Sequence, residues 1–540
     1  MRVSFLVVGL SIAASLLAAC SLNSGPQMQA CEKLKDLRLG HAQVVAADYK
    51  SSGPEISFKT ALLGIFWFDV PASCRVKIVD APTSDSHIEM EVWMPAESWN
   101  QRLWSGGNGG LAGSIDELSM TIALSRGYAT SGTDTGHIAA DTDGSWALGH
   151  PQKLIDYGYR SIHETAVMAK AVMQAFYGKQ PSYSYFSSGS NGGREALQEA
   201  QRYPDDYIGI EVGAPAFNGT NNIVAGSWIE QRLRASKDSW FSPAKLPAIA
   251  AAAMDKCDAL DGLKDGLIDD PRRCHVDPDA LLCKGAENDG CLTAPQVESL
   301  KAIYEGPGGK DPAGYPYYGY APGGETLWDT WQLGSEPDKA FLYRFALEFH
   351  RYLIYGNPNW TLDKFKLQSD REETFRRMGP FYDATNPDLS RFAARGGKLI
   401  LFHGWADMAL QPNLTIDYYE RVRSRIGAQT ADKFIMLYMV PGMAHVTAGY
   451  GPNAFGQMMA PTPNATPATN IGSALEDWVE KDAKPGPIVA AKYSSDIKAL
   501  IASDGMTPTR TRPLCPYPQV EHWSGKGSID DAKNFTCVNP

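Results

Sequence analysis

A short stretch rich in serine and glycine carries the residues best suited to chemistry. Residues 185–195 read YFSSGSNGGRE and hold three serines ahead of a glycine pair. A serine hydroxyl is a poor nucleophile at neutral pH, so it needs a base within hydrogen-bond reach. It also needs a tight turn that presents its oxygen. The nucleophile elbow, G-x-S-x-G between a strand and a helix, supplies such a turn if the residues two positions before and after the serine are small.

Steric room at this turn selects one of the three serines. Ser187 and Ser188 each follow a large aromatic residue by two positions. Ser190 has Ser188 before it and Gly192 after it, so it alone fits, with a serine in place of the first glycine of the pattern. The sequence therefore predicts Ser190 as the nucleophile. The alternative is a Ser/Gly turn that only closes a strand.

The base and its orienting acid are expected after the nucleophile, in the order Ser, Asp, His. Asp407 follows an expected strand at 398–402 (KLILF), and His445 follows another at 433–440 (KFIMLYMV). All three residues then lie just beyond strands, on the same edge of a parallel sheet, where ligands bind in such folds. We expect a catalytic triad of Ser190, Asp407 and His445; the alternative is that Asp407 and His445 are structural loop residues.

An oxyanion hole requires backbone N–H groups aimed at the developing negative charge. One donor is expected from Asn191, which follows the nucleophile at a helix start. The second is expected from the glycine-rich loop 106–110, at Gly109 or Gly110. The alternative for this loop is a phosphate cradle, which is disfavoured because the P-loop lysine is missing.

Strands and helices alternate around these residues in a pattern that predicts an α/β sheet with crossover helices. Residues 217–394 differ, because they combine helices, Pro/Gly loops, aromatics and four cysteines. We predict a first core part at 20–216, an inserted lid domain at 217–394 and a second core part at 395–540. The further expected elements are antiparallel strands at 56–69 and 74–92, strands within 101–113, 127–137 and 183–186, and helices at 153–177 and 193–203.

Composition and charge narrow the class of ligand. Hydrophobic residues make up 44% and charged residues 21% of the 540 residues, which is typical of a globular protein. The formal net charge is −11, and no Lys/Arg cluster is found, so a nucleic-acid partner is disfavoured. A neutral or weakly charged small molecule fits better; the oligomeric state stays open.

The N-terminus has the form of an export signal. Arg2 precedes a short apolar run and small residues that lead to Cys20, which predicts a signal peptide at residues 1–19. The stretch LAAC at 17–20 resembles a bacterial lipobox, so we expect a lipid on Cys20 and anchoring at the outer membrane or periplasm. The alternatives are ordinary secretion and a permanent transmembrane anchor.

Eight further cysteines in an exported chain favour disulfides, although eight cysteines allow 105 connectivities. Closeness in sequence groups six of them as 257 with 274, 283 with 291 and 515 with 537, which leaves a fourth pair. The eight residues are Cys31, Cys74, Cys257, Cys274, Cys283, Cys291, Cys515 and Cys537.

Four motifs together resemble the tannase and feruloyl esterase family, which includes the hydrolases of terephthalate monoesters. They are YFSSGSNGGREALQEAQRYP, HGWAD, PGMAH with GPNAFG, and HPQKLIDYGYRSIHE. The resemblance spans nearly the whole mature chain. It implies an α/β-hydrolase core with a large lid, and it places the triad at Ser190, Asp407 and His445.

One departure from the family pattern concerns the active site. Relatives have G-C-S-x-G-G at the nucleophile and H-C at the base, and the two cysteines form a disulfide that ties the triad together. This chain has Gly189 and Val446 at those positions. Both cysteines are lost together, which indicates an adapted site.

The lid holds two further predicted features. An acidic stretch with turn glycines, CDALDGLKDGLIDD at 257–270, suits a hard cation, although an acidic turn without metal is the alternative. The resemblance implies a structural calcium site. Aromatic residues of the lid are candidates to cover an aromatic acyl group, although core packing is the favoured alternative for most of them. Arg344 is a candidate to pair with a substrate carboxylate, and a surface arginine is the favoured alternative. The implied calcium ligands are Asp258, Asp261, Asp265 and the carbonyls of Leu263 and Leu267, and the aromatic candidates include Trp328 and Trp331.

The resulting expectation is an exported serine esterase that cleaves esters of aromatic, phenolic carboxylic acids through an acyl-enzyme. The alternative within the same class is a hydrolase of terephthalate monoesters. The alternative from another class is a non-catalytic, surface-binding lipoprotein on a hydrolase scaffold.

Overall fold

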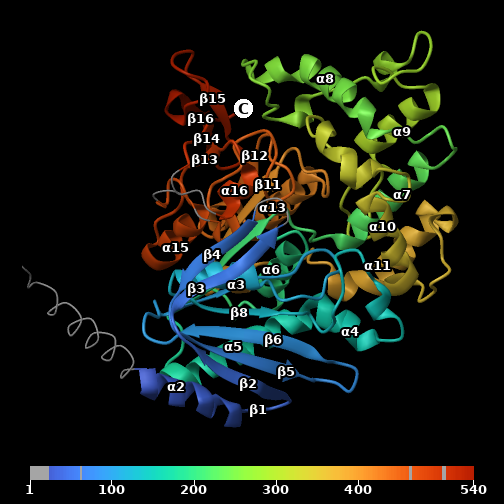
Figure 1. Cartoon of the computed structure of the whole chain (residues 1–540). Helices are drawn as coiled ribbons and strands as arrows, with labels where there is room; N and C mark the ends of the chain where they lie inside the picture. Colours follow the sequence, from blue (N-terminus) through green and yellow to red (C-terminus); the bar gives the residue numbers. More distant parts are fainter. Residues whose placement is uncertain (1–23, 61–63, 461, 463–464, 502–505) are drawn as a thin grey trace, which may run out of the picture.

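The structure, a computed structural model, describes residues 24–60, 64–460, 462, 465–501 and 506–540 (Figure 1). The predicted signal peptide and Cys20 lie outside the described residues. Among the described helices, none combines the length and apolar character needed to cross a membrane.

A ten-stranded mixed sheet forms the core, in the order β1-β2-β5-β6-β8-β7-β9-β10-β11-β12. Strands from β8 to β12 in this order pair in parallel, whereas β1, β2, β5 and β6 add an antiparallel edge. The strands are Arg38–Leu39 (β1), Ala42–Lys50 (β2), Ser73–Asp80 (β5), Ile88–Pro95 (β6), Arg102–Ser105 (β7), Ala129–Thr133 (β8), Tyr183–Gly189 (β9), Gly209–Gly213 (β10), Lys398–Gly404 (β11) and Ile435–Val440 (β12).

The parallel strands are apolar on both faces because helices cover each side. On β11, Leu399 and Leu401 pack with α6 and α13, whereas Ile400 and Phe402 pack with α15 on the opposite face. The period-2 alternation of strand side chains explains this division. The helices of the core are Ser24–Glu32 (α2), Glu117–Ser125 (α3), Pro151–Ile155 (α4), Ser161–Tyr177 (α5), Asn191–Arg202 (α6), Pro412–Ile426 (α13), Ala428–Ala431 (α14), Ile471–Lys481 (α15) and Asp496–Ile501 (α16).

Between β10 and β11 the chain leaves the sheet and forms a helical insertion, drawn in green to yellow on one side of the molecule (Figure 1). Its own core is apolar and includes Trp328, Phe241 and Leu300. Its main helices are Gly219–Leu233 (α7), Leu246–Cys257 (α8), Ala294–Glu305 (α9), Phe341–Glu348 (α10), Leu367–Tyr382 (α11) and Ser390–Ala394 (α12).

The three remaining sheets are two-stranded and lie outside the core sheet. The C-terminal strands extend beside the insertion in Figure 1. The pairs are β3 (Gly53–Thr60) with β4 (Gly64–Val70), β13 (Ile488–Lys492) with β14 (Arg510–Leu514), and β15 (Val520–Trp523) with β16 (Phe535–Val538).

The described residues contain four disulfides, namely the three pairs grouped by closeness in sequence and the pair that remained. They join Cys31 with Cys74, Cys257 with Cys274, Cys283 with Cys291, and Cys515 with Cys537.

The expected α/β fold is confirmed, and two differences from the expected elements lie close to the candidate site. The helix expected over 153–177 is divided, because a π-helical turn, η3 (Asp156–Arg160), lies between α4 and α5. Strand β10 was not expected, although it pairs with β9 and β11 at the centre of the parallel half. Its five residues, GIEVG, include a glycine at each end, which hides the strand signal.

Candidate active site

Ser190 occupies a strained turn between β9 and α6. Its backbone has φ 61° and ψ −126°, a conformation that non-glycine residues rarely adopt. The Ser190 amide donates to the carbonyl of Gly213 at 2.9 Å, and the Ser190 carbonyl accepts from the amide of Ala216 at 2.9 Å. A Cβ on Gly192 would collide with the Ser188 side chain. The small residues expected around a nucleophile elbow are therefore required by the packing here.

Gly189 and Val446 lie against each other. A Cβ placed on Gly189 would lie 2.5 Å from Cγ1 of Val446. Gly189 precedes Ser190 and Val446 follows His445, so this contact brings the nucleophile and base segments together. Val446 itself has φ 56°, which is unfavourable for a β-branched residue.

Asp407 is buried and accepts hydrogen bonds on both oxygens. His445 Nδ1 lies 2.8 Å from Asp407 Oδ2, and the amides of Ala409 and Leu410 donate to Oδ1 at 2.7 and 2.9 Å. His403 Nε2 also lies 3.0 Å from Oδ2. Burial acts to raise the pKa of Asp407, but His445 and His403 outweigh it and hold the pKa well below its ordinary value. The carboxylate is therefore ionised.

His403 is a member of this arrangement that the sequence did not single out. It is buried on β11, and its Nδ1 lies 2.7 Å from the hydroxyl of Thr415. A second, buried imidazole thus also holds the carboxylate of Asp407. The motif HGWAD contains the signal, because His403 and Asp407 are four residues apart around one turn.

An apolar pocket opens beside Ser190. Ser190, Asn191 and Asn222 supply its polar side chains. Trp331 of the insertion reaches both the pocket and His445, with ring centroids 6.0 Å apart. The remaining lining residues are Gly110, Leu111, Ala216, Gly219, Ile223, Leu342, Phe345, Phe349, Tyr382, Ala409 and Leu410.

Two of the predicted substrate contacts lie elsewhere. Trp328 does not line the pocket; its fully buried indole packs in the core of the insertion, edge to face with Tyr304. Arg344 is exposed on α10, with its guanidinium over the ring of Phe341. Both residues are one turn or less from residues that do line the pocket, so helix phase decides which side chains enter it.

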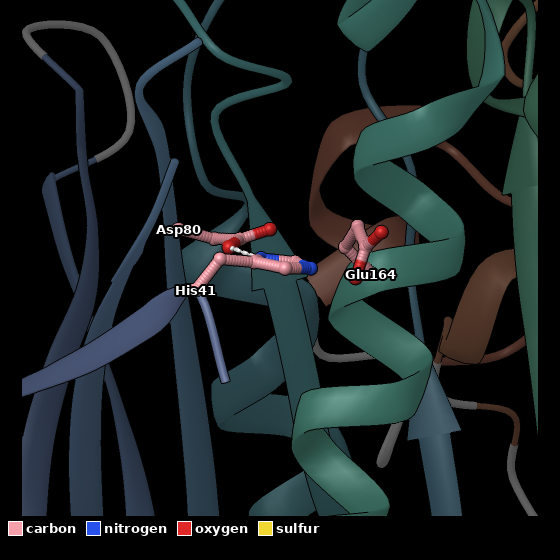
Figure 2. A group of neighbouring side chains, drawn as sticks. All are labelled: His41, Asp80 and Glu164. Atoms are coloured by element: carbon pink, nitrogen blue, oxygen red, sulfur yellow. Dashed lines mark hydrogen bonds and ion pairs between the residues drawn. The ribbon is translucent and has the colours of Figure 1, made fainter. Parts of the chain in front are cut away.

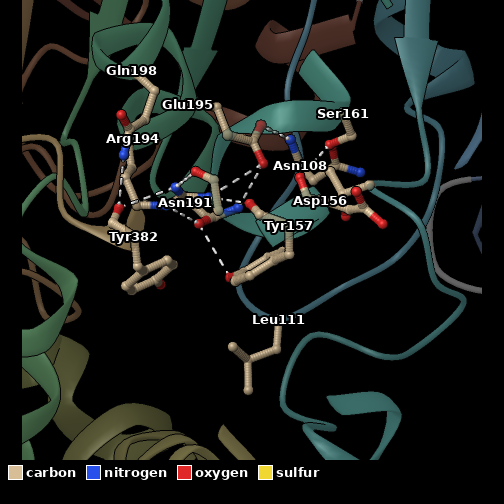
Figure 3. Close-up of polar contacts among 12 residues, drawn as sticks. Asn108, Leu111, Asp156, Tyr157, Ser161, Asn191, Arg194, Glu195, Gln198 and Tyr382 are labelled. Atoms are coloured by element: carbon tan, nitrogen blue, oxygen red, sulfur yellow. Dashed lines mark hydrogen bonds and ion pairs between the residues drawn. The ribbon is translucent and has the colours of Figure 1, made fainter. Parts of the chain in front are cut away.

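The two predicted oxyanion segments are joined by buried hydrogen bonds (Figure 3). The Tyr157 hydroxyl lies 2.6 Å from the carbonyl oxygen of Gly110 and 3.2 Å from Oδ1 of Asn191. Of the two candidate glycines, Gly110 lines the pocket, whereas the Gly109 carbonyl accepts from the amide of Ala112 within the loop. Tyr157 lies in the π-helical turn η3, and such turns often occur at functional sites.

Glu195 makes a second link between the same segments. Its Oε2 accepts from the amide of Asn108 at 3.0 Å, and its Oε1 accepts from the side-chain amide of Asn191 at 2.9 Å. Burial raises the pKa of Glu195 to about 7, opposed by the charge of Arg194 and by these hydrogen bonds. Arg194 Nε in turn donates to Oδ1 of Asn191 at 2.7 Å. Figure 3 shows Asn191 at the centre of this network.

The acidic turn of the insertion holds the predicted calcium ligands. Oδ1 of Asp258 accepts from the amides of Asp265 and Gly266 at 3.1 and 3.0 Å, and Asp265 is ion-paired with Arg512. Burial, together with Asp265 and Asp258, raises the pKa of Asp261 to about 6. The carboxylates of Asp269 and Glu521 join the cluster, and Glu521 Oε2 is buried with no hydrogen-bond partner. Excess carboxylate oxygen and an unpaired buried oxygen suit a hard cation.

We expect Tyr157 to act as a positioning residue. Tyr157→Phe removes the hydrogen bond to Gly110 and leaves the buried ring, so kcat should fall about tenfold with KM nearly unchanged, because only a donor used in the transition state is misplaced. Steady-state kinetics on one chromogenic ester measure the split. Tyr159→Phe, in the same π-helical turn, is the matched control. Equal effects of the two changes on kcat, or a change in KM alone, would contradict this role.

The contact between Gly189 and Val446 predicts that a disulfide can be restored. In the double variant Gly189→Cys, Val446→Cys, we expect both thiols to be consumed, because a Cβ at position 189 would lie in direct contact with the side chain at position 446. Gly189→Cys alone should lose activity, since its Cβ would press on Val446. Thiol titration and activity with and without reductant test both statements. Two free thiols in the oxidised double variant would show that the segments are not aligned as described.

Comparisons with known proteins agree with this geometry. The profile of the family described as "Tannase and feruloyl esterase" matches residues 74–538. An uncharacterized esterase of Xanthomonas campestris pv. campestris is 39% identical, over 98% of this chain and 95% of its own. A protein named "Probable feruloyl esterase B-2" of Aspergillus terreus is 31% identical, over 86% of each chain.

Solved structures of this group have the same fold. The crystal structure of feruloyl esterase B from Aspergillus oryzae superposes with a TM-score of 0.84 at 28% identity, covering 95% of this chain and all of that one. The tannin acyl hydrolase from Aspergillus niger superposes with a TM-score of 0.72 at 21% identity, covering 95% of this chain and 94% of that one. The chain is thus an α/β-hydrolase and a carboxylic ester hydrolase, and it belongs to the tannase and feruloyl esterase family.

Proposed function

We propose that this protein is a serine esterase that hydrolyses esters of phenolic carboxylic acids, such as ferulate or gallate esters, through an acyl-enzyme. One observation carries the proposal: an aromatic-lined pocket opens directly at Ser190 and Asn191, next to the imidazole held by Asp407. Trp331, Phe345 and Phe349 give this pocket flat apolar walls, which suit an aromatic ring.

The residues divide the chemistry in the manner of a Ser-His-Asp triad. Ser190 Oγ attacks the ester carbonyl carbon while Nε2 of His445 takes the hydroxyl proton. Asp407, bonded to Nδ1, holds the imidazole in the required tautomer and stabilises the imidazolium. His445 then gives the proton to the leaving alcohol. A water molecule, activated by the same imidazole, attacks the acyl-enzyme and releases the acid.

The amides of Asn191 and Gly110 are proposed to bind the oxyanion. The amide of Asn191 begins α6, so the positive end of the helix dipole adds to the stabilisation. Tyr157 and Glu195 hold the two donors at a fixed separation through the bonds described above. A preorganised donor of this kind contributes about 3–4 kcal/mol to lowering the barrier.

The pocket favours a neutral acyl group over a charged one. Its lining, within the described part of the chain, contains no lysine or arginine that could pair with a free carboxylate. Arg194 lies behind the wall, where its guanidinium faces Tyr382 at 4.4 Å and donates to the carbonyl oxygens of Tyr157, Gly158 and Tyr382. Asn222 is placed to meet a phenolic hydroxyl. A terephthalate monoester, whose acyl group carries a second carboxylate, is therefore the poorer substrate.

A panel of esters tests the proposal. We expect methyl ferulate and a gallate ester to be hydrolysed with kcat/KM at least tenfold above that of a terephthalate monoester, because the charged acyl group would enter an apolar pocket unpaired. Ser190→Ala should abolish hydrolysis of all three. Preference for the terephthalate monoester would select the alternative substrate. Full turnover by Ser190→Ala would exclude Ser190 as the nucleophile. If the wild type hydrolysed none of the esters, the alternative of a non-catalytic, surface-binding lipoprotein would be favoured.

We also propose a structural calcium ion in the insertion. It would be held by the side chains of Asp258, Asp261 and Asp265 and by the carbonyls of Leu263 and Leu267. Support comes from the crowding of carboxylates on this turn. Disulfides anchor the region on both sides. Cys257 precedes the turn, and the pair Cys515–Cys537 links the end of β14, the strand of Arg512, to β16, where Cys537 lies opposite Glu521 of β15. The ion's role is to hold the insertion to the C-terminal strands.

Removal of calcium should lower the stability of the protein and leave the arrangement of Ser190, Asp407 and His445 unchanged. With a hundredfold excess of calcium over its Kd, binding stabilises the folded state by about 2.7 kcal/mol. We therefore expect a chelator to lower the melting temperature of the wild type, and Asp261→Asn to abolish that response. Asp289→Asn, an exposed aspartate of the same insertion, is the control. A melting temperature that does not change with chelator would contradict the proposal.

The location in the cell is proposed from the leader. Cleavage before Cys20 and lipidation of that residue would leave the mature chain tethered to a membrane surface. Four disulfides are consistent with an oxidising compartment.

A further inference from the structure

A histidine and two carboxylates meet at the antiparallel edge of the core, on three separate elements (Figure 2). His41 lies in the turn between β1 and β2, Asp80 ends β5, and Glu164 lies in the first turn of α5. One ligand atom of each side chain lies within 4.8 Å of the others. His41 Nδ1 is 2.5 Å from Oδ1 of Asp80. In Figure 2 the far side of the imidazole ring points toward Glu164.

The carboxylates of this cluster have oxygens without partners among the described residues. Asp80 is fully buried, and its Oδ2 has no hydrogen-bond partner. The side chain of Glu164 makes no hydrogen bond or ion pair with a described residue. A buried carboxylate oxygen without a donor is destabilising, because its lost hydration is not replaced. An unpartnered oxygen aimed into a group of metal-ligating side chains points to a bound cation.

The net charge around the cluster is negative enough to be balanced by a divalent cation. Asp156 lies close enough to interact electrostatically with Asp80, and so does Glu164. The nearby cation Arg160 is already engaged, with Nε 2.6 Å from Oδ1 of Asp156 and Nη1 3.1 Å from Oε1 of Gln152. Three carboxylates and one guanidinium give a formal charge of −2 when His41 is neutral, which one divalent ion would balance.

We propose that His41, Asp80 and Glu164 bind a divalent transition-metal cation of the zinc class, with water completing the coordination. One imidazole nitrogen with two carboxylate oxygens is a donor set that Zn²⁺ accepts, whereas Ca²⁺ takes oxygen ligands. The ion would replace the proton shared by His41 and Asp80. His41 has 48% of its side chain exposed, so the ion can enter from solvent.

The site would join α5 to the β1–β2 turn and the end of β5, which strand pairing between β2 and β5 already connects. The amide of Ala81, next to Asp80, donates to the carbonyl of His41 at 3.4 Å, so the β1–β2 turn already rests on the end of β5. A cation would add α5 to this contact. The helix α5 continues from the π-helical turn that holds Tyr157. An ion bound to α5 would therefore also stabilise the position of Tyr157 beside the proposed oxyanion segments.

A second cluster, His163, Glu199 and Asp206, has the same residue types but a different charge balance. Lys170 lies there, with Nζ 3.8 Å from Oδ1 of Asp206 and 2.5 Å from the Asp206 carbonyl oxygen. The lysine ammonium already offsets part of the negative charge of this cluster. This cluster therefore serves as the internal control for the first.

Zinc binding to the full chain, with calcium held at saturation, tests the inference. We expect isothermal titration calorimetry to show a zinc site that weakens at least tenfold in His41→Ala and in Glu164→Gln, since loss of one ligand of three removes a direct bond. His163→Ala should bind as the wild type does. His41 lies in an exposed turn, and Glu164→Gln is isosteric, so circular dichroism should show both variants folded.

Thermal melting gives a second measurement on the same proteins. Zinc at a hundredfold excess over its Kd should raise the melting temperature of the wild type and of His163→Ala, but not of His41→Ala or Glu164→Gln. Anomalous scattering at the zinc edge would place the ion beside His41. The inference is overturned if the wild type binds no zinc, if the His41 and Glu164 variants bind it unchanged, or if only His163→Ala loses it. Hydrolysis of aromatic esters is a separate readout, so either proposal can fail alone.

Discussion

The active site depends on one constraint, the left-handed backbone of Ser190. A conformation of this kind costs about 1–3 kcal/mol and persists only where the surrounding structure over-determines it. Here the amide of Ser190 is bonded to Gly213 at the end of β10, and its carbonyl accepts from Ala216 beyond the same strand. The turn is therefore held from the neighbouring strand, and the glycines around it are present because a side chain at Gly189, Gly192 or Gly213 would collide.

The same crowding shows how the triad is aligned without the family's disulfide. Gly189 leaves a space into which Val446 fits, so packing joins the nucleophile and base segments. In this position Val446 has a positive φ, which is unfavourable for a branched side chain. Asp407 supplies the rest of the alignment, because two imidazoles and two amides converge on it. Directional hydrogen bonds and one van der Waals contact thus take the place of a covalent link.

Local sequence was enough to find Ser190, Asp407 and His445 as candidates, because each follows a strand in a short and specific motif. The parts that the sequence did not reveal depend on pairing between distant segments. Tyr157 meets Gly110 and Asn191 only because a π-helical turn shifts it out of ordinary helical phase. Strand β10 and the C-terminal strands were missed because they are four or five residues long and carry weak strand signals.

The helical insertion is part of the active site as well as its cover. Trp331 stacks near Phe345 and also lies edge to face with the imidazole of His445, so the same side chain lines the proposed acyl pocket and borders the proposed base. A Cβ on Gly110 would lie 2.9 Å from Cζ of Phe345, so the insertion also packs against the proposed oxyanion loop. Movement of the insertion would therefore alter the pocket, the base and an oxyanion donor together. The insertion is held in place by contacts such as the ion pair between Asp265 of the acidic turn and Arg512. Such contacts would affect catalysis from a distance, because they fix the surface that the proposed acyl group must fit.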